Sequence, residues 1–275
     1  MEVERGTIRI DGRRYAWHST GSGPPLILVN GYAASGADWD REFLSALAPD
    51  FKLLCPDNRG IGGSDRGDGE MTIGVMAADV KQLMDRLELE TVGLCGWSMG
   101  GYIVQALAET APDRVSSLTL IGTHPGGPAY VPTGDAEAYA NLIDYSGTPE
   151  DQARRLISVF FPPEATAAAE ARLLDAFAAA RARLDHRTLD DQVAALLAWR
   201  DREPPRLASR PPALVLHGAR DRLVSAGNAT PLASRWAAEV EIFEESAHAA
   251  MAQEPARAAS AIASLGAPAG RPECE

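Results

Sequence analysis

The chain has 275 residues, enough for one large domain with an insertion or for two small domains, and it can bury a sizeable core. Hydrophobic residues make up 45% and charged residues 23%, which is ordinary for a soluble globular protein. The formal net charge of −12 at pH 7 argues against a nucleic-acid or anionic membrane partner, since either would need a basic patch.

The N-terminal part of the chain predicts a hairpin and two buried strands. Apolar residues alternate with polar ones on both sides of the dipeptide Asp11-Gly12, a pair that favours a tight hairpin turn. Residues 26–29 and 51–55 form short apolar runs, typical of strands that are buried on both faces of a parallel sheet. Apolar residues at helical spacing predict a helix between the two runs, around 40–48.

Strands and helices keep alternating up to residue 124. Helical spacing of apolar residues predicts helices over 71–87 and 99–110, and the strands between and after them fall at 91–95 and 115–121. Strict alternation with short connections predicts an α/β fold built on a mostly parallel, doubly wound sheet.

The alternation stops over residues 125–207, which begin with prolines and glycines and continue as helical sequence rich in Ala, Leu, Arg and Asp. It then resumes with strands and helices at 213–216, 229–237, 240–243 and 254–265. We therefore expect a core made of 1–124 and 208–266, a helical cap or lid at 125–207, and a mobile tail at 267–275.

One serine stands in a setting typical of a nucleophile. The stretch Gly96-Trp97-Ser98-Met99-Gly100 fits G-x-S-x-G and lies between a predicted strand and a predicted helix, as that motif requires. In such a turn the serine is strained, the glycines avoid clashes, and the hydroxyl projects above the carboxyl edge of the sheet. The backbone N–H of Met99 then lies at a helix N-terminus, where it can stabilise an oxyanion.

A serine nucleophile needs a base, and the base needs a group that orients it. Of the five histidines, His248 follows the last predicted strand, and Asp221 follows the strand that ends near His217. Ser98, Asp221 and His248 thus come in the order and at the strand ends that a Ser-Asp-His arrangement on an α/β-hydrolase sheet requires.

On these motifs the sequence resembles the α/β-hydrolase superfamily, particularly its lid-bearing esterase, lactonase and cofactor-free haloperoxidase-like branch, over almost the whole chain outside the insertion. The stretch from Asp57 to Asp65 resembles the family's D-x-R-G-x-G-x-S-D loop. His217-Gly218 with Asp221 resembles its acid loop, and the stretch from His248 to Pro255 resembles its histidine-containing end motif.

The resemblance implies an α/β-hydrolase fold with a helical lid and assigns roles to particular residues. Ser98 corresponds to the nucleophile, His248 to the general base and later acid, and Asp221 to the group that holds the tautomer of His248. The backbone N–H groups of Tyr32 and Met99 correspond to the oxyanion hole. A serine rather than an aspartate at position 98 separates the chain from haloalkane dehalogenases and epoxide hydrolases and indicates acyl transfer.

Two positions depart from the family pattern. Asn30-Gly31 stands where the family usually has His-Gly, so Asn30 either supports the oxyanion loop or tunes the pocket. His124 stands where a small residue is expected; it either contacts substrate or assists proton transfer, or it is a solvated turn histidine. Trp97 either packs under the elbow or lines the pocket.

The predicted substrate-binding residues are Asn30, Gly31, Trp97, His124, Tyr145, Phe160 and Phe161. The last three belong to a wider set of apolar and aromatic lid residues that either line the pocket or pack the lid against the core. Its other members are Tyr139, Leu142, Ile143, Leu156, Ile157, Phe177 and Trp199.

These residues predict a hydrolase that cleaves a carboxylic ester or lactone of a small, largely apolar substrate. The alternatives are a non-hydrolytic enzyme of natural-product biosynthesis on the same fold (acyl transfer, elimination or cyclisation) or a ligand receptor. No dinucleotide fingerprint, P-loop or metal-ligand spacing is present, so we expect no cofactor and no metal.

Cysteine usage and the N-terminus bear on location. Three cysteines without short spacings form no disulfide framework, and neither a leader-like apolar segment nor a membrane-spanning stretch is found. We expect a cytoplasmic protein whose partner is a small-molecule substrate, with a homodimer as one option.

Overall fold

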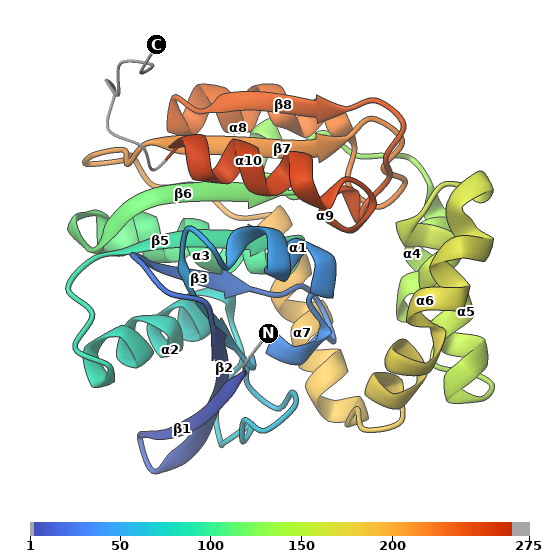
Figure 1. The fold of residues 1–275 in the computed structure, drawn as a ribbon, viewed down its shortest axis with the longest axis horizontal. Coiled ribbons are helices and arrows are strands. Elements are labelled where there is room, and N and C mark those ends of the chain that lie inside the picture. Colours follow the sequence, from blue (N-terminus) through green and yellow to red (C-terminus); the bar gives the residue numbers. More distant parts are fainter. Residues whose placement is uncertain (1–2, 266–275) are drawn as a thin grey trace.

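The computed structural model describes residues 3–265, and Figure 1 shows their arrangement. The predicted mobile tail at 267–275, and residue 266 at the end of the predicted core, lie outside the described residues.

The described chain forms one eight-stranded sheet in the order β1-β2-β4-β3-β5-β6-β7-β8. The strands are β1 (Glu4–Ile10), β2 (Arg13–Thr20), β3 (Pro25–Val29), β4 (Lys52–Pro56), β5 (Val92–Trp97), β6 (Val115–Ile121), β7 (Ala213–Gly218) and β8 (Glu239–Phe243). Strand β2 pairs antiparallel with β1 and with β4, and the remaining neighbours pair parallel. The sheet is therefore mostly parallel, as the alternation of the sequence predicts.

Helices cover both faces of the sheet, which explains the continuous apolar runs (Figure 1). One face carries α2 (Ile73–Arg86), α3 (Met99–Thr110) and α8 (Ala229–Trp236), and the other carries α1 (Arg41–Leu47), α9 (Ala250–Gln253) and α10 (Pro255–Leu265). In β3, Ile27 and Val29 belong to the apolar cluster of the first face, whereas Leu26 and Leu28 belong to that of the second. Each side chain of such a strand therefore has a core to enter.

The lid consists of four helices between β6 and β7, placed beyond the carboxyl ends of the parallel strands (Figure 1). They are α4 (Ala136–Ile143), α5 (Pro149–Phe160), α6 (Pro163–Arg181) and α7 (His186–Arg200). Three of them begin where a side chain caps the first turn: Asp135 accepts from the N–H of Ala138, Asp185 from that of Thr188, and Thr148 opens a capping box.

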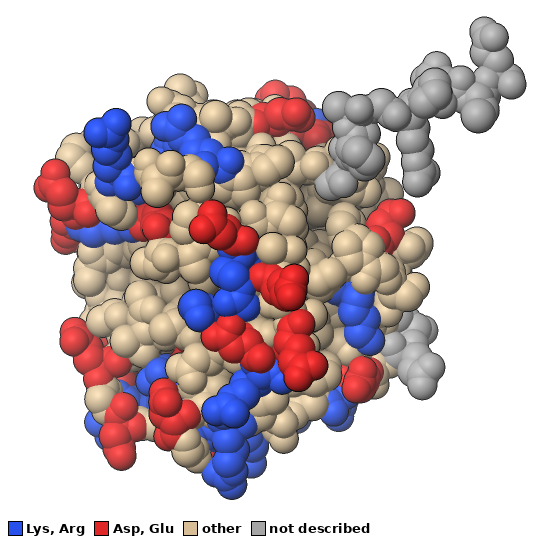
Figure 2. Space-filling model, turned by 90° about the vertical axis from the view of Figure 1, so that its left-hand side faces the viewer, with Lys and Arg blue, Asp and Glu red and all other residues tan. Residues whose placement is uncertain are grey.

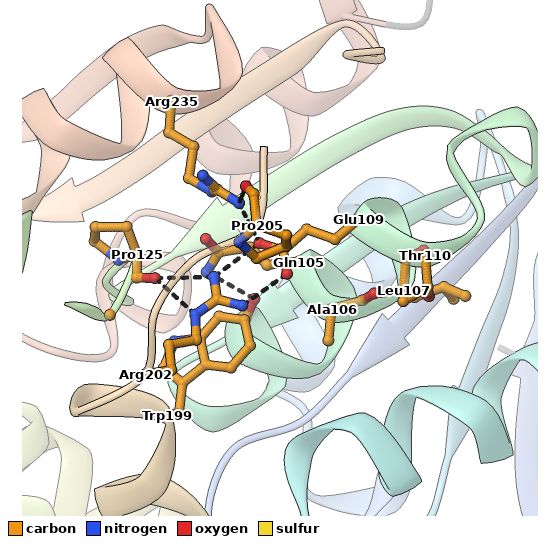
Figure 3. Close-up of polar contacts among 12 residues, drawn as sticks. Gln105, Ala106, Leu107, Glu109, Thr110, Pro125, Trp199, Arg202, Pro205 and Arg235 are labelled. Carbon is orange, nitrogen blue, oxygen red and sulfur yellow. Dashed lines mark hydrogen bonds and ion pairs between the residues drawn. The ribbon is translucent and has the colours of Figure 1, made fainter. Parts of the chain in front are cut away.

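A partly buried ion cluster holds both ends of the lid to the core (Figure 3). The carboxylate of Glu109 in α3 accepts from Arg202 at 2.6 and 2.7 Å and from Arg235 of α8 at 2.7 Å. Arg202 also donates to the carbonyl of Pro125 and lies over the ring of Trp199, 3.2 Å from its centroid. Since Pro125 follows β6 and Arg202 follows α7, one carboxylate fixes the entrance and the exit of the lid.

On the face turned to the viewer in Figure 2, acidic and basic side chains are interspersed. Within residues 3–265, no helix combines the length and the apolar character needed to cross a bilayer.

Candidate active site

Ser98 lies in a strained turn between β5 and α3. Its backbone has φ 56° and ψ −120°, a conformation that residues other than glycine rarely adopt. Three hydrogen bonds hold it there: its N–H donates to Ile121 at 2.9 Å, and its carbonyl accepts from Gly101 and from the hydroxyl of Thr123, both at 2.9 Å. The surrounding backbone therefore determines the conformation of the serine, as expected for strain kept at a functional position.

The glycines around Ser98 are required by close backbone contacts. A Cβ atom at Gly96 would come 2.4 Å from the carbonyl oxygen of Gly100, and one at Gly100 would come 1.9 Å from that of Val29. At Gly101 a Cβ would come 2.5 Å from the hydroxyl oxygen of Thr123. No larger residue fits these positions without moving the backbone, so the helix starts directly behind the serine.

A buried carboxylate orients His248. Its Nδ1 lies 2.7 Å from Oδ2 of Asp221, whose Oδ1 accepts from the backbone N–H groups of Leu223 (2.8 Å) and Val224 (2.9 Å). Both residues of the pair are almost fully buried, with His248 2% and Asp221 8% exposed. Since the carboxylate can only accept, Nδ1 carries the proton and Nε2 is left with a lone pair.

A second histidine contacts the same carboxylate. His217, fully buried at the end of β7, lies 3.4 Å from Oδ2 of Asp221 through Nε2, which donates to the carbonyl of Val224 at 2.9 Å. Burial alone would raise the pKa of Asp221. The charge interaction with His248 and the hydrogen bonds from both histidines outweigh this effect, so the pKa lies below its ordinary value. Asp221 therefore remains ionised throughout the neutral and mildly acidic range.

Trp97 both supports the elbow and faces the cavity, so both interpretations of its sequence position hold. Its Nε1 donates to the carbonyl of His248 at 2.9 Å, and its ring lies 5.3 Å from the imidazole and 5.3 Å from Phe160, centroid to centroid. Phe160 also contacts the imidazole, at 5.5 Å. These two aromatic rings keep His248 in place and exclude water from its surroundings.

Asn30 supports the oxyanion loop and lines neither cavity described below. Its side-chain oxygen accepts from Gly31 at 2.8 Å, its amide nitrogen donates to Ser35 at 2.9 Å, and its carbonyl accepts from Asn58 at 3.1 Å. The prediction that Asn30 binds substrate is therefore corrected: its polar groups are used inside the loop, and it is fully buried.

The loop that Asn30 supports lies directly against Ser98. A Cβ at Gly31 would come 3.2 Å from Cβ of Ser98 and 3.7 Å from its hydroxyl oxygen. Among residues 3–265, no hydrogen bond uses the N–H of Tyr32 or of Met99, nor the hydroxyl of Ser98. Two free amides beside a free hydroxyl are what an oxyanion hole and its nucleophile require before substrate binds.

Two cavities meet at Ser98, Tyr32 and Leu142. The first, which we call the phenylalanine lobe, also contacts His248, and its walls include Gly31, Trp97, Leu156, Phe160, Phe177 and Arg181. The second, which we call the tyrosine lobe, has a volume of about 360 Å³, and its walls include Tyr102, His124, Tyr130, Tyr139, Leu196 and Arg200. The phenylalanine lobe is the smaller, at about 50 Å³, so a bound molecule can extend from the serine in two directions with its smaller group in that lobe.

His124 is a buried cavity residue, and the interpretation as a solvated turn is wrong. It is 5% exposed, and its ring lies between those of Tyr102 (4.5 Å) and Tyr130 (4.4 Å). Its Nδ1 accepts from the N–H of Gly126 at 3.1 Å. Burial, together with the charge of Arg202, lowers the pKa of His124 to about 3, so the ring is neutral and carries its proton on Nε2.

Two predicted lid residues lie outside both cavities. Phe161 follows α5 as its C-cap and is 4% exposed; its N–H donates to the carbonyl of Ile157, and its side chain packs in the apolar cluster of the second sheet face. Tyr145 instead reaches the oxyanion loop, where its hydroxyl donates to that of Tyr32 at 2.7 Å. Phe161 points away from the cavity that its chain neighbour Phe160 lines, whereas the hydrogen bond to Tyr32 holds Tyr145 outside the cavity walls.

Among the cavity residues that escaped prediction are Tyr102, Tyr130 and Arg181. Tyr102 could have been found, because it stands four positions after Ser98 at the start of a predicted helix and therefore on the same side of it. Tyr130 and Arg181 gave no such signal.

An α/β sheet with a Ser-Asp-His arrangement at its carboxyl edge defines a class of proteins, and the comparisons with known proteins agree. The sequence model of the family described as "alpha/beta hydrolase fold" matches residues 24–255. The chain therefore belongs to the α/β-hydrolase family.

Individual relatives carry different activities in their names. A soluble epoxide hydrolase from Corynebacterium sp. (strain C12) is 32% identical over 57% of this chain and 55% of that protein. A putative non-heme bromoperoxidase, BpoC, from Mycobacterium tuberculosis is 30% identical over 51% of this chain and 55% of that protein. The chain thus spans about half the length of these curated relatives. A solved hydrolase structure from Pseudomonas aeruginosa PA01 matches with a TM-score of 0.78 and 28% identity, covering 95% of this chain and 97% of that one.

Proposed function

We propose that the protein is a serine hydrolase that cleaves a carboxylic ester or lactone of a small substrate through an acyl-serine intermediate. One observation carries the proposal. Ser98, in its strained turn, faces the same cavity as His248, whose Nδ1 lies 2.7 Å from the buried carboxylate of Asp221.

The first half of the reaction acylates the serine. Nε2 of His248 takes the proton of the Ser98 hydroxyl while its oxygen attacks the substrate carbonyl carbon. The N–H groups of Tyr32 and Met99 stabilise the negative charge that forms on the carbonyl oxygen, and one such donor contributes about 10²- to 10³-fold in rate. His248 then gives its proton to the leaving oxygen, and the acyl group stays on Ser98.

The second half releases the acid. His248 takes a proton from a water molecule, whose oxygen attacks the acyl-serine carbonyl through the same oxyanion site. The ester bond to Ser98 breaks and its oxygen takes back the proton, so one ester and one water become one acid and one alcohol. Asp221 remains a carboxylate throughout and stabilises the imidazolium that forms in each half.

The nucleophile favours this chemistry over that named for the epoxide hydrolase relative. Opening an epoxide with an aspartate gives an ester, whose carbonyl water can attack. Opening it with Ser98 would give an ether, which contains no carbonyl and would leave the enzyme blocked. A serine therefore suits a substrate that brings its own carbonyl group, and the two lobes give room for a group on each side of it.

Labelling with a fluorophosphonate tests the proposal without a guess at the substrate. Intact-mass analysis should show one adduct on the wild-type protein and on Ser158→Ala, which removes an exposed serine of α5. Ser98→Ala should show none, and it should lose hydrolysis of p-nitrophenyl butyrate as well. A folded wild-type protein that is neither labelled nor active on short esters would contradict the proposal and favour a non-hydrolytic enzyme or a receptor.

A further inference from the structure

The phenylalanine lobe contains one cation. Arg181, the last residue of α6, is 6% exposed and lines this lobe together with Ser98 and His248. Its other lid-side walls are apolar, formed by Leu142, Leu156, Phe160 and Phe177. An arginine in such surroundings has lost most of its hydration.

The contacts that Arg181 makes do not replace that hydration. Nη2 donates to the carbonyl of Leu142 at 3.0 Å, and the guanidinium carbon lies 4.4 Å above the ring centre of Tyr145. Within the described chain, Nε and Nη1 are buried without any hydrogen-bond partner, and no carboxylate lies within ion-pair distance of the side chain. Buried donors are normally satisfied, and a charged one most of all.

Arg59 shows what the protein does with a buried arginine that has only a structural role. It is the other arginine below a tenth exposed in residues 3–265, and it pairs with the buried carboxylate of Asp79 through two of its nitrogens. Arg181 has the same burial and lacks the carboxylate.

The acidic residue that lines the lobe does not pair with Arg181. Asp38 also lines the phenylalanine lobe, but its carboxylate accepts from the N–H of Ser35 at 2.7 Å and from its hydroxyl at 2.8 Å. Burial raises the pKa of Asp38, the opposite of what an ion pair with Arg181 would do.

A chain of side-chain contacts also connects Arg181 with the reacting groups. Its guanidinium lies over the ring of Tyr145, whose hydroxyl donates to that of Tyr32 at 2.7 Å, and Tyr32 is the residue whose N–H we assign to the oxyanion hole. A group bound to Arg181 is thereby connected through two side chains to the position of the scissile carbonyl.

We propose that Arg181 binds a carboxylate of the substrate, so that the natural substrate is an anionic ester or lactone with its carboxylate in the phenylalanine lobe. This rests on the proposed function and narrows the substrate expected from sequence, which was largely apolar. The planar guanidinium offers two parallel donors to a carboxylate, and the apolar walls strengthen that interaction.

Matched pairs of esters test the proposal and also locate the carboxylate. Mono-p-nitrophenyl glutarate and p-nitrophenyl valerate differ in a carboxylate on the acyl side. 4-Butanoyloxybenzoate and phenyl butanoate differ in one on the alcohol side. Arg181→Met should lower kcat/KM about 10- to 100-fold for the anionic ester of at least one pair, and less than about threefold for its neutral counterpart.

Two further variants separate charge recognition from structure. Arg187→Met removes an exposed arginine of α7 and should leave all four esters unaffected. Arg181→Lys keeps the charge but lacks the two parallel donors of the guanidinium, so it should recover part of the activity on the anionic ester that Arg181→Met loses. Because the buried donors lack acceptors, Arg181→Met should not lower Tm. Equal losses on the anionic and neutral esters of both pairs would overturn the proposal.

A binding measurement keeps this inference distinct from the proposed function. In calorimetry, glutarate should bind to Ser98→Ala more tightly than its neutral diamide, and Arg181→Met in that background should abolish the difference. If Ser98 is labelled and neutral esters are hydrolysed, but glutarate binds no more tightly than its diamide, the carboxylate-site proposal is wrong and the hydrolase proposal stands. If Ser98 is inert but glutarate binding depends on Arg181, the hydrolase proposal fails and the anion site stands.

Discussion

Replacing Asp221 by asparagine changes which nitrogen of His248 carries the proton. Oδ1 of Asp221 accepts from two backbone N–H groups, those of Leu223 at 2.8 Å and Val224 at 2.9 Å. Because these N–H groups can only donate, the side-chain oxygen of the new asparagine must take the Oδ1 position. Its NH₂ group then faces Nδ1 of His248, and that nitrogen must accept a hydrogen bond instead of donating one.

The cost follows from the tautomer. With Nδ1 as acceptor, Nε2 of the neutral ring carries the proton and cannot receive another from Ser98. The corresponding substitution in a serine protease, which keeps the geometry and changes the tautomer, lowers kcat about 10⁴-fold. Since Asp221 is buried and holds both of its amide contacts in the variant, we expect a fall of about 10³- to 10⁴-fold in kcat/KM, with the substrate-binding lobes unchanged.

Steady-state hydrolysis of p-nitrophenyl butyrate measures this loss. Asp113→Asn, which alters an exposed aspartate outside both lobes, serves as the matched control and should retain full activity. In Asp221→Asn the labelling of Ser98 by the fluorophosphonate should also slow, because labelling needs the same proton transfer from Ser98 to His248 as hydrolysis does. A folded Asp221→Asn protein within about tenfold of wild type would refute the reasoning, since the tautomer would then not limit the reaction.

Two further predictions concern stability. Burial lowers the pKa of His124 to about 3, so between its ordinary value of about 6.5 and that pH the unfolded chain binds a proton that the native chain does not. The free energy of unfolding therefore falls as pH is lowered through this window. In urea unfolding, His124→Phe should reduce the slope of this free energy against pH by up to about 1.4 kcal/mol per pH unit. An unchanged slope would contradict the lowered pKa of His124. Glu109→Gln should lower the free energy of unfolding by up to about 3–5 kcal/mol, because the side chains of Arg202 and Arg235, 14% and 16% exposed, would lose their carboxylate. Urea unfolding measures this against Glu137→Gln, whose side chain is 80% exposed; equal losses in the two variants would count against the cluster.

The core of the site could be predicted from sequence because its physical requirements are local. A chain can turn sharply enough to present Ser98 only if the positions around it lack a Cβ. A Cβ added at Gly96, Gly100 or Gly101 would in each case lie within 2.6 Å of another atom. The alternation of buried strands and amphipathic helices likewise predicts the sheet, since each short apolar run needs a core on both faces.

The lid could not be predicted to the same detail, because which side chains enter the cavity depends on how each helix is rotated. α6 has small residues all around it, so its sequence does not reveal which face is buried. Phe160 and Phe161 are neighbours in the chain, yet one lines the phenylalanine lobe and the other packs in the core. Tyr145 illustrates a third outcome, contact with the oxyanion loop through its hydroxyl.

Arg181 shows why the substrate class emerges only from the fold. In sequence it resembles the nearby Arg183 and Arg187, which are exposed. Packing against Tyr145 and Leu142 removes it from water but supplies too few acceptors, which costs stability unless another molecule completes the set. The chain meets this requirement for Arg59 with its own carboxylate and leaves it unmet for Arg181. The unsatisfied guanidinium of Arg181 lines the same lobe as Ser98, where a ligand can relieve it.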